Sequence, residues 1–494
     1  MKLEFEYGQG FMEANLPDET TDSFIPGVDY LDPPHILLDE LVEETRKSIL
    51  NPVGMAPISK SVKKGDKVTI VFPDRVKGGS QPTAHRKVSI AIILEELYKA
   101  GVEKKDIKLI CSNGLHRKNT ESEIRGLLGD AIFHAFWYSK QIVNHDSEDY
   151  DNLIDIGYDD IGDRVIMNKE VYDSDFAILI GHSMGNPYGG YSGGYKHCAT
   201  GITHWRSIAE HHNPHVMHRD DFTPTTTHSL MREKFDHIGL YMEKCMGKKF
   251  FCCDAVLDTK ANQIALFSGY ALDIQPLCWE IANKRTYAKW ADKKYDVMIF
   301  GMPQAFHYGN GMGTNPILMM QAISAQILRH KRVMNDNCVI ICSSICNGYW
   351  HEEEFPSYEE TYNIFQKNYN NILPDIAKYG EYMSTKKEYT DKYRFNYGYH
   401  PFHTFSMTSC GHIAEMNTSA IYIVGAMEPG LARGMGMKTR ASFEEALEDA
   451  KKKFVGKNPN ILALPKAFTT AAMHICMKDD VIQGLKKFRR KETS

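Results

Sequence analysis

The segment Tyr191 to Gly201, YSGGYKHCATG, places a lysine shortly after two adjacent glycines. Gly193 and Gly194 allow close approach of the backbone to a ligand, and free N–H groups in such a turn form an anion-binding concavity. A P-loop would need a further upstream glycine and a Ser or Thr directly after the lysine, whereas His197 follows here. The segment favours a phosphate near Lys196 and argues against ATP hydrolysis.

Histidines are concentrated around this lysine. One lies upstream and six lie within a short region that begins next to it: His182, His197, His204, His211, His212, His215 and His218. Imidazole is a ligand for nickel, copper, iron and zinc. For each histidine the alternative is a surface position or a satisfied place in the core. Their density nevertheless indicates a metal site.

A further histidine, His116, lies in the loop SNGLHRKN, directly after the apolar run Ile107 to Cys111. A helix is predicted to follow the loop, because Thr120 and Glu123 have the spacing of a capping box. Open α/β sheets bind ligands at the carboxyl ends of their strands. We therefore expect His116 to lie at a ligand site.

The elements that must position these residues alternate along the chain. VTIVF (Val68 to Phe72) precedes a helical pattern near Val88 to Ala100, and IKLIC and FAILIG are further apolar runs. This alternation is typical of βαβ units on a buried parallel sheet. From about Phe250, FFCCDAVLD and NQIALFSG predict an antiparallel pair that closes a first domain.

A second α/β pattern begins after the polar segment WEIANKRTYAKWADKKYD, which is predicted to be helical. Its apolar runs are DVMIFG, CVIICSS, AIYIVG and ILALP. The expected fold class is α/β, with two α/β domains, mostly parallel sheets and a ligand cleft between them. The boundary is placed near residue 288, giving domains 1–288 and 289–494.

A long excursion interrupts the second domain between residues 350 and 412. It is rich in Tyr, Phe, Glu and Asn, with a helical middle at Glu359 to Tyr379. An excursion of this length is either functional or a packing accessory, and both interpretations remain open.

Composition narrows the class of protein. A chain of 494 residues is too long for one hydrophobic core. Its net charge of -5, without runs of basic residues, gives no positive surface that would bind nucleic acid. No stretch reaches the roughly 18 apolar residues of a membrane helix, and the N-terminus is neither basic nor apolar. The eleven cysteines form no zinc-type pair. We expect a cytoplasmic protein with reduced thiols and no nucleic-acid or membrane partner.

Several blocks together resemble the lactate racemases and their homologues, which use a nickel-pincer nucleotide cofactor. The blocks, in order, are NPVGMAPISKSVKKGDKVTIVFPD, SNGLHR, GHSMGNPYGGYSGGYKHCATG with IAEHH after it, and GAMEPGLARGMGMKTRASFEEALEDA. The resemblance runs through most of the chain.

This resemblance implies roles for individual residues. It implies that Lys196 is joined covalently to the cofactor through a thioamide, and that His212 ligates nickel, with the adjacent His211 as the alternative ligand. It also implies that His116 takes and returns a substrate hydroxyl proton, which suits an imidazole that titrates near neutrality. The remaining implied cofactor and substrate contacts are Ser192, Gly193 and Gly194 of the SGGxK motif, the acidic Asp74, and Lys77, which stands where the family has a substrate-binding arginine and has Arg75 nearby.

Besides Lys77, two positions depart from the family pattern. Asn186 occupies the position of the second catalytic histidine, and an amide cannot act as a general base. Ser324 occupies the position of a lysine that helps to hold the substrate carboxylate. Three explanations of Asn186 remain open: another group such as His182 or Tyr188 replaces the histidine, His116 acts alone with proton exchange through water, or the amide binds a substrate hydroxyl.

Both departures point to a more polar substrate than lactate, such as a sugar acid. Residues in two loops of the second domain are candidate contacts to it: His307, Tyr308, His351 and Glu353.

The expected function is an isomerase that racemises or epimerises a hydroxyl-bearing carbon by reversible hydride transfer to a covalently bound nickel-pincer nucleotide, through a transient ketone. One alternative is an epimerase at another carbinol position, or a redox enzyme, with the same cofactor. Another is a non-catalytic nickel- or nucleotide-binding protein. The expected partners are a small hydroxy acid or sugar acid and the enzymes that build the cofactor, and the oligomeric state is left open.

Overall fold

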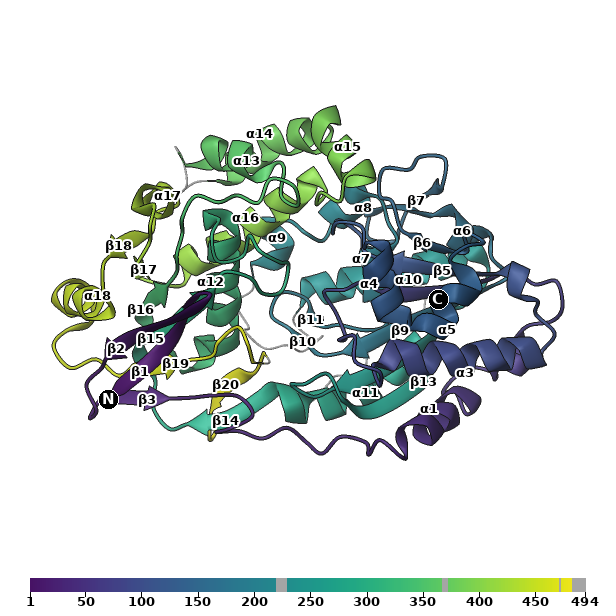
Figure 1. The fold of residues 1–494 in the computed structure, drawn as a ribbon, viewed down its shortest axis with the longest axis horizontal. Helices are drawn as coiled ribbons and strands as arrows, with labels where there is room; N and C mark the ends of the chain where they lie inside the picture. The colour runs from purple at the N-terminus through teal and green to yellow at the C-terminus, as the bar shows by residue number, and fades with distance from the viewer. Residues whose placement is uncertain (219–228, 367–371, 471, 482–494) are drawn as a thin grey trace.

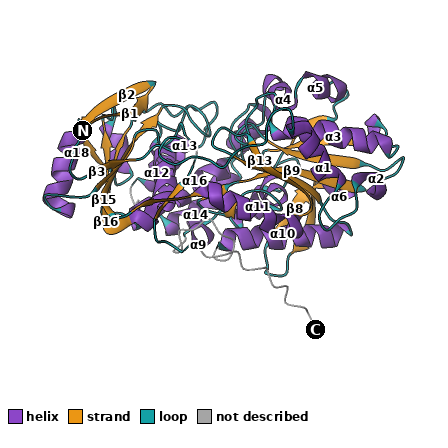
Figure 2. Ribbon diagram, turned by 90° about the horizontal axis from the view of Figure 1, so that it is seen from below, coloured by secondary structure: helices purple, strands orange, loops and turns teal. Residues whose placement is uncertain are grey.

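The computed structural model describes residues 1–218, 229–366, 372–470 and 472–481. Its elements form two α/β units, each built on a mostly parallel sheet, as the alternating pattern predicts. Figure 2 shows helices on both sides of the strands in each unit.

The first sheet has the strand order β13-β12-β9-β4-β5-β6. Its strands are β4 (Val68–Pro73), β5 (Ile107–Ser112), β6 (Ile142–Asn144), β9 (Phe176–Ser183), β12 (Phe251–Leu257) and β13 (Gln263–Tyr270). All neighbours pair in parallel except β12 and β13, so the predicted closing antiparallel pair is confirmed.

Successive residues of β4 enter different cores, because side chains of a strand alternate between the two faces of a sheet. Ile70 and Phe72 pack with α3 (His85–Lys99), α4 (Glu121–Leu128) and α5 (Asp130–Phe136). Val71 packs on the opposite face, in the core that also holds residues of α7 (Lys196–Gly201) and α10 (Leu230–Met246). The capping box that starts α4 at Thr120 is confirmed.

The second sheet has the order β18-β17-β16-β15-β1-β2, with β19 paired to both β15 and β3. Its strands are β1 (Lys2–Gly8), β2 (Gly10–Asn15), β3 (Thr21–Ser23), β15 (Tyr295–Pro303), β16 (Met334–Ser343), β17 (Ala420–Val424), β18 (Lys438–Arg440) and β19 (Ile461–Leu464). On one face it packs with α18 (Phe443–Ala450), and on the other with α12 (Pro316–His330) and α16 (Pro401–Met416).

The structure differs from the prediction in two segments. The first three strands join the second sheet, so residues 2–23 do not lie with the first domain as expected (Figure 1). The segment predicted as one helix forms the C-terminal part of α11 (Ala271–Thr286) and then the strand β14 (Tyr287–Ala291). This strand pairs with β20 (His474–Met477). That partner lies almost 200 residues away, and no local pattern encodes such a pairing. The boundary near residue 288 stays a prediction.

The excursion between residues 350 and 412 is helical. It contains α13 (Tyr358–Phe365), α14 (Leu373–Ser384), α15 (Lys387–Phe395) and the start of α16. The predicted helical middle thus falls on α13 and α14, while residues 367–371 lie outside the described part of the chain. α16 packs against α12.

The remaining elements are short helices and two-stranded pairs around the two sheets. They are α1 (Leu41–Leu50), α2 (Ile58–Ser61), β7 (Leu153–Tyr158), β8 (Arg164–Asn168), α6 (Lys169–Asp173), β10 (Gly185–Asn186), β11 (Gly190–Tyr191), α8 (Trp205–Ala209), α9 (Pro214–Met217) and α17 (Pro429–Gly434).

Candidate active site

Loops that follow parallel strands of both sheets meet at two adjoining cavities. Asp74 follows β4, the His116 loop follows β5, and the loop with His307 follows β15. A cavity of about 860 Å³, partly open to solvent, is lined by His116, Lys196 and His212 among others. A second cavity of about 1190 Å³ shares six of the sequence-derived candidates with the first: Lys77, Asn186, Tyr188, Lys196, His307 and Tyr308. The ligand position expected at the strand ends is therefore where the structure has its cavities.

His116 forms a pair with Asp74. Its Nδ1 lies 2.6 Å from Asp74 Oδ2, and Asp74 is buried. Burial lowers the pKa of His116, and the charge of Asp74 only partly offsets this. Burial acts to raise the pKa of Asp74, but His116 and nearby cations together lower it below its ordinary value. A carboxylate only accepts hydrogen bonds, so Nδ1–H of a neutral imidazole is the donor and Nε2 keeps its lone pair. The pair is thus arranged for a base that acts through Nε2.

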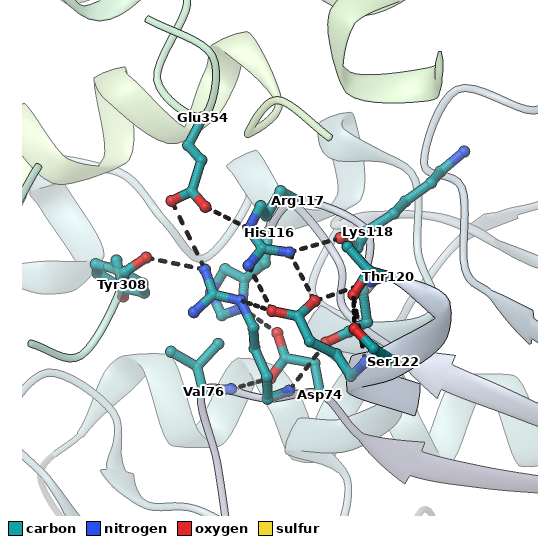
Figure 3. A network of polar contacts seen from close by, with 12 residues as sticks. Asp74, Val76, His116, Arg117, Lys118, Thr120, Ser122, Tyr308 and Glu354 are labelled. Atoms are coloured by element: carbon teal, nitrogen blue, oxygen red, sulfur yellow. Dashed lines mark hydrogen bonds and ion pairs between the residues drawn. The ribbon is translucent and has the colours of Figure 1, made fainter. Parts of the chain in front are cut away.

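The loop that carries His116 is tied to the 350–412 excursion through Arg117. Arg117 Nε donates to Glu354 Oε1 at 2.9 Å, and its terminal nitrogens donate to Glu123. Figure 3 shows Glu354 above the guanidinium of Arg117. Arg75 donates to the carbonyl of Tyr308 at 3.0 Å and lies within ion-pair distance of Glu123 and Glu354. Arg75 is therefore held by the protein and lines neither cavity, whereas Lys77 lines both.

Lys196 is buried at the start of α7 and lines both cavities. Burial lowers the pKa of its ammonium well below the ordinary value, and the charges of Lys77 and Arg232 lower it further. Within the described residues, Nζ makes no hydrogen bond or ion pair. A lowered pKa increases the fraction of free amine, which is the nucleophilic form of lysine.

Several N–H groups of the glycine turn before Lys196 are engaged within the protein. The N–H of Gly194 donates to Asp254 Oδ2 at 2.8 Å, and the N–H groups of Lys196 and His197 donate to carbonyls within the turn. A carboxylate below the turn also repels a second anion. The buried strand β12 thus places Asp254 below the turn, and the expected phosphate contact near Lys196 stays a prediction. The backbone conformation requires glycine at position 193. Gly193 has φ +89°, and a Cβ there would lie 2.7 Å from Asp254 Oδ2.

His211 and His212 have different surroundings. His211 is fully buried, with Nε2 at 3.2 Å from the carbonyl of Ala199 and Nδ1 at 2.6 Å from Nδ1 of His212. A carbonyl only accepts, so Nε2–H of His211 is the donor and Nδ1 of His211 accepts from Nδ1–H of His212. Nε2 of His212 then holds a lone pair. Since His212 lines the first cavity and His211 does not, His212 is the histidine placed to bind a metal ion there.

Asn186 lies at the end of β10 and lines both cavities. Its Oδ1 accepts from the N–H groups of Tyr188 and Gly189, at 3.0 and 2.8 Å. The side chain can therefore offer the cavities only its Nδ2–H groups. This arrangement suits binding of a hydroxyl or carbonyl oxygen and not removal of a proton.

The other candidates from the sequence divide into those at a cavity and those elsewhere. Lining one or both cavities are His182, Tyr188, Ser192, His307 and Tyr308. Lining neither are His197, His204, His215, His218, Ser324, His351 and Glu353. Ser324 is buried and donates to the carbonyl of Cys410 at 2.6 Å, so no lysine-like contact arises from that position.

The cavity residues that were not found from the sequence include three polar side chains of α12 and α16. Gln321 of α12 lines both cavities, and His403 and Ser406 of α16 line the first. No motif marks them. They reach the site because α16 and α12 pack together, and a pattern of helical apolar residues carries no information on which side chain faces a cavity.

In the part of the chain that the structure describes, no three His, Cys, Asp or Glu side chains are grouped so as to hold a metal ion. Among those same residues, no helix is both long and apolar enough to cross a bilayer.

Comparison with known proteins gives a consistent result. The family model of the lactate racemase N-terminal domain matches residues 7–223. Lactate racemase of Lactiplantibacillus plantarum is 24% identical over 227 residues, which are 46% of this chain and 50% of that protein. Lactate racemase of Thermoanaerobacterium thermosaccharolyticum is 20% identical over 269 residues, or 54% of this chain and 59% of that protein. The match thus spans about half the length of these relatives.

Solved structures extend the similarity in fold over nearly the whole chain. The lactate racemase apoprotein from T. thermosaccharolyticum superposes with a TM-score of 0.69 at 18% identity, covering 96% of this chain and all of that one. A protein from Thermotoga maritima superposes with a TM-score of 0.56 at 12% identity, covering 90% of this chain and all of that one.

Proposed function

Since this chain belongs to the lactate racemase family, we propose that it is a cytoplasmic racemase or epimerase that inverts a hydroxyl-bearing carbon of a 2-hydroxy acid or sugar acid. The observation that carries the proposal is the meeting of Lys196, His212 and His116 at one cavity. A free amine, a lone-pair nitrogen and a base paired with a carboxylate are the groups that such a reaction needs.

The donor set fits a nickel-pincer nucleotide attached to Lys196. A buried amine without a partner can condense with a thiocarboxylate, and the half-buried imidazole of His212, with the lone pair of its Nε2, can complete the coordination of Ni(II). When bound, this group supplies the acceptor and donor of the hydride. The second cavity, which shares Lys196 and extends past Ser192 and Arg329, has room for a nucleotide.

The protein's own part in the reaction is to handle the proton. Nε2 of His116 takes the proton of the substrate hydroxyl, and Asp74 stabilises the imidazolium that forms. Return of a proton to the oxygen after the carbon has been reduced from its other face gives the opposite configuration.

The cavity suits an anionic substrate with several hydroxyls. Lys77 is half-buried, lines both cavities and forms no hydrogen bond or ion pair of its ammonium group with a described residue. An ammonium without a partner can bind a carboxylate, though as a point charge and not in the bidentate manner of arginine. Asn186, Gln321 and Ser406 add polar groups for hydroxyls.

The first test is the intact mass and nickel content of protein co-expressed with enzymes that build the cofactor, followed by peptide mapping across Lys196. We expect an adduct on Lys196, about one nickel per chain, and inversion of at least one member of a panel of 2-hydroxy acids and sugar acids. An unmodified, metal-free chain from cells that modify a lactate racemase would refute the cofactor assignment.

Two variants separate the parts of the proposal. Lys196→Arg keeps a long basic side chain but cannot form the thioamide, so the adduct should vanish. His212→Asn should keep an adduct on Lys196 while losing nickel. If a cofactor binds but is released intact when the protein is denatured, the protein is a carrier and not an enzyme of this kind.

A further inference from the structure

The arrangement around His116 leaves a stereochemical requirement unmet. The two enantiomers of a carbinol that present their C–H to the same hydride acceptor direct their hydroxyls differently, so one fixed base serves only one of them well. Asn186 cannot be the second base, because its Oδ1 is engaged by two backbone N–H groups and Nδ2 only donates.

His403 lies opposite His116 in the same cavity. It belongs to α16, its side chain is buried, and its ring centroid is 5.8 Å from that of His116 with the planes at 84°. Both rings line the first cavity, so they border the same space and can each meet a substrate hydroxyl there.

The ring of His403 is fixed as firmly as that of His116. Its Nδ1 lies 2.6 Å from the hydroxyl oxygen of Tyr358, and Nε2 is buried with no partner among the described residues. Tyr308 and Tyr399 each pack against both imidazoles, with centroid distances between 4.6 and 5.7 Å. An oriented imidazole with one nitrogen held and the other unsatisfied at a cavity is the arrangement of a histidine that meets a ligand.

We infer that His403 is the second proton-transferring residue, acting through Nε2 on the substrate hydroxyl that His116 does not reach. The inference rests on the proposed function. For one enantiomer the hydroxyl proton passes to Nε2 of His403 while the carbon gives its hydride, with both bonding electrons, to the bound cofactor. The resulting ketone receives the hydride back on its other face and a proton from His116, and exchange with water resets the two imidazoles.

His307 is the competing candidate for the second base, since it lines the first cavity as His403 does, and the second cavity as well. Its ring packs on Tyr308 at 4.3 Å, but neither ring nitrogen has a hydrogen-bond partner in the described parts of the chain. Nothing then fixes the direction in which either nitrogen points. The site therefore favours His403.

The test uses loaded wild type and the variants His116→Asn, His403→Asn and His307→Asn. Each is mixed with the separate enantiomers of lactate, malate and glycerate for a single turnover, and the ketone is trapped with hydroxylamine and quantified by mass spectrometry. For a pair that the wild type converts, His403→Asn should slow ketone formation from one enantiomer by about 100-fold or more, and His116→Asn from the other.

The matched control is His412→Asn, on the same helix but lining neither cavity, which should leave both rates unchanged. Equal losses on both enantiomers in His403→Asn would mean a structural role and overturn the inference. So would an enantiomer-selective loss in His307→Asn in place of His403→Asn.

A second measurement needs no cofactor. ¹⁵N NMR of the apoprotein, with the His403 signals assigned from His403→Asn, reports which ring nitrogen carries the proton. A base acting through Nε2 requires the Nδ1–H form, with Nδ1 donating to Tyr358, and observation of the Nε2–H form would contradict the inference. Absence of the Lys196 adduct and of wild-type turnover would instead sink the proposed function and the inference with it.

Discussion

Replacing Asp74 by Asn removes the charge beside His116, together with the long hydrogen bond of 3.3 Å that Val76 N–H donates to Oδ1. The two side chains have the same shape, and the amide oxygen of Asn can still accept from Nδ1–H, so the ring keeps its tautomer. What is lost is the attraction between a buried carboxylate and the imidazolium that forms as the proton is taken, across a contact of 2.6 Å.

A hydrogen bond to a charged group contributes about 1.5–3 kcal/mol. If that stabilisation develops only as His116 becomes protonated, its loss lowers kcat/KM by about 10- to 150-fold, since 1.36 kcal/mol is a factor of ten. The direction of the pH effect follows from the pair. The charge of Asp74 raises the pKa of His116, so removing it lowers that pKa further and moves the acidic limb of the pH profile to lower pH.

The assay is inversion of the substrate by Asp74→Asn and wild type, with nickel content and the Lys196 adduct measured on the same samples. The matched control is Asp160→Asn at the exposed pair of His237 and Asp160, whose nitrogen and oxygen lie 2.7 Å apart. That variant should keep full activity. Unchanged kcat/KM in fully loaded Asp74→Asn, or an acidic limb displaced to higher pH, would refute the role of the pair.

Three more predictions concern binding, folding and pH. Lys77→Met should raise KM for an anionic substrate by about 10-fold or more with little change in kcat, because it removes a charged contact present throughout the reaction; an unchanged KM would contradict this. Gly193→Ala should destabilise the fold by about 1–3 kcal/mol in urea denaturation, since a Cβ would meet a buried carboxylate at 2.7 Å, whereas Gly247→Ala, at φ +68° with open space, should lose only about 1 kcal/mol. Burial lowers the pKa of His85 and His145 to about 4 from 6.5, so the unfolded chain takes up these protons first and stability should fall by about 1.4 kcal/mol per pH unit for each histidine as pH drops from 6.5 to 4; a flat profile of denaturation midpoints across that window would show that these groups are not buried as neutral imidazoles.

The sequence alone determined the local elements and part of the site. The apolar runs that became β4, β5, β9 and β15 are short, β-branched and bounded by turns, which is enough to predict buried strands. The capping box at Thr120 acts over three residues and was equally readable. Lys196, His212 and His116 were found because they lie in contiguous motifs, and the structure brings them to one cavity.

The tertiary structure decided what depends on segments distant in the chain. The strand β14 exists because β20 pairs with it, and β1 to β3 belong to the second sheet because β15 and β19 accept them. The preference for His212 over His211 as the candidate metal ligand depends on the carbonyl of Ala199. This carbonyl accepts from Nε2–H of His211, so Nδ1 of His211 accepts from His212 and Nε2 of His212 keeps its lone pair. His403 faces His116 only because α16 packs across α12 and the excursion that precedes it binds the His116 loop through Glu354 and Arg117. Hydrogen-bond direction and cavity exposure are properties of assembled neighbours, so a pattern of residue types along one segment does not contain them.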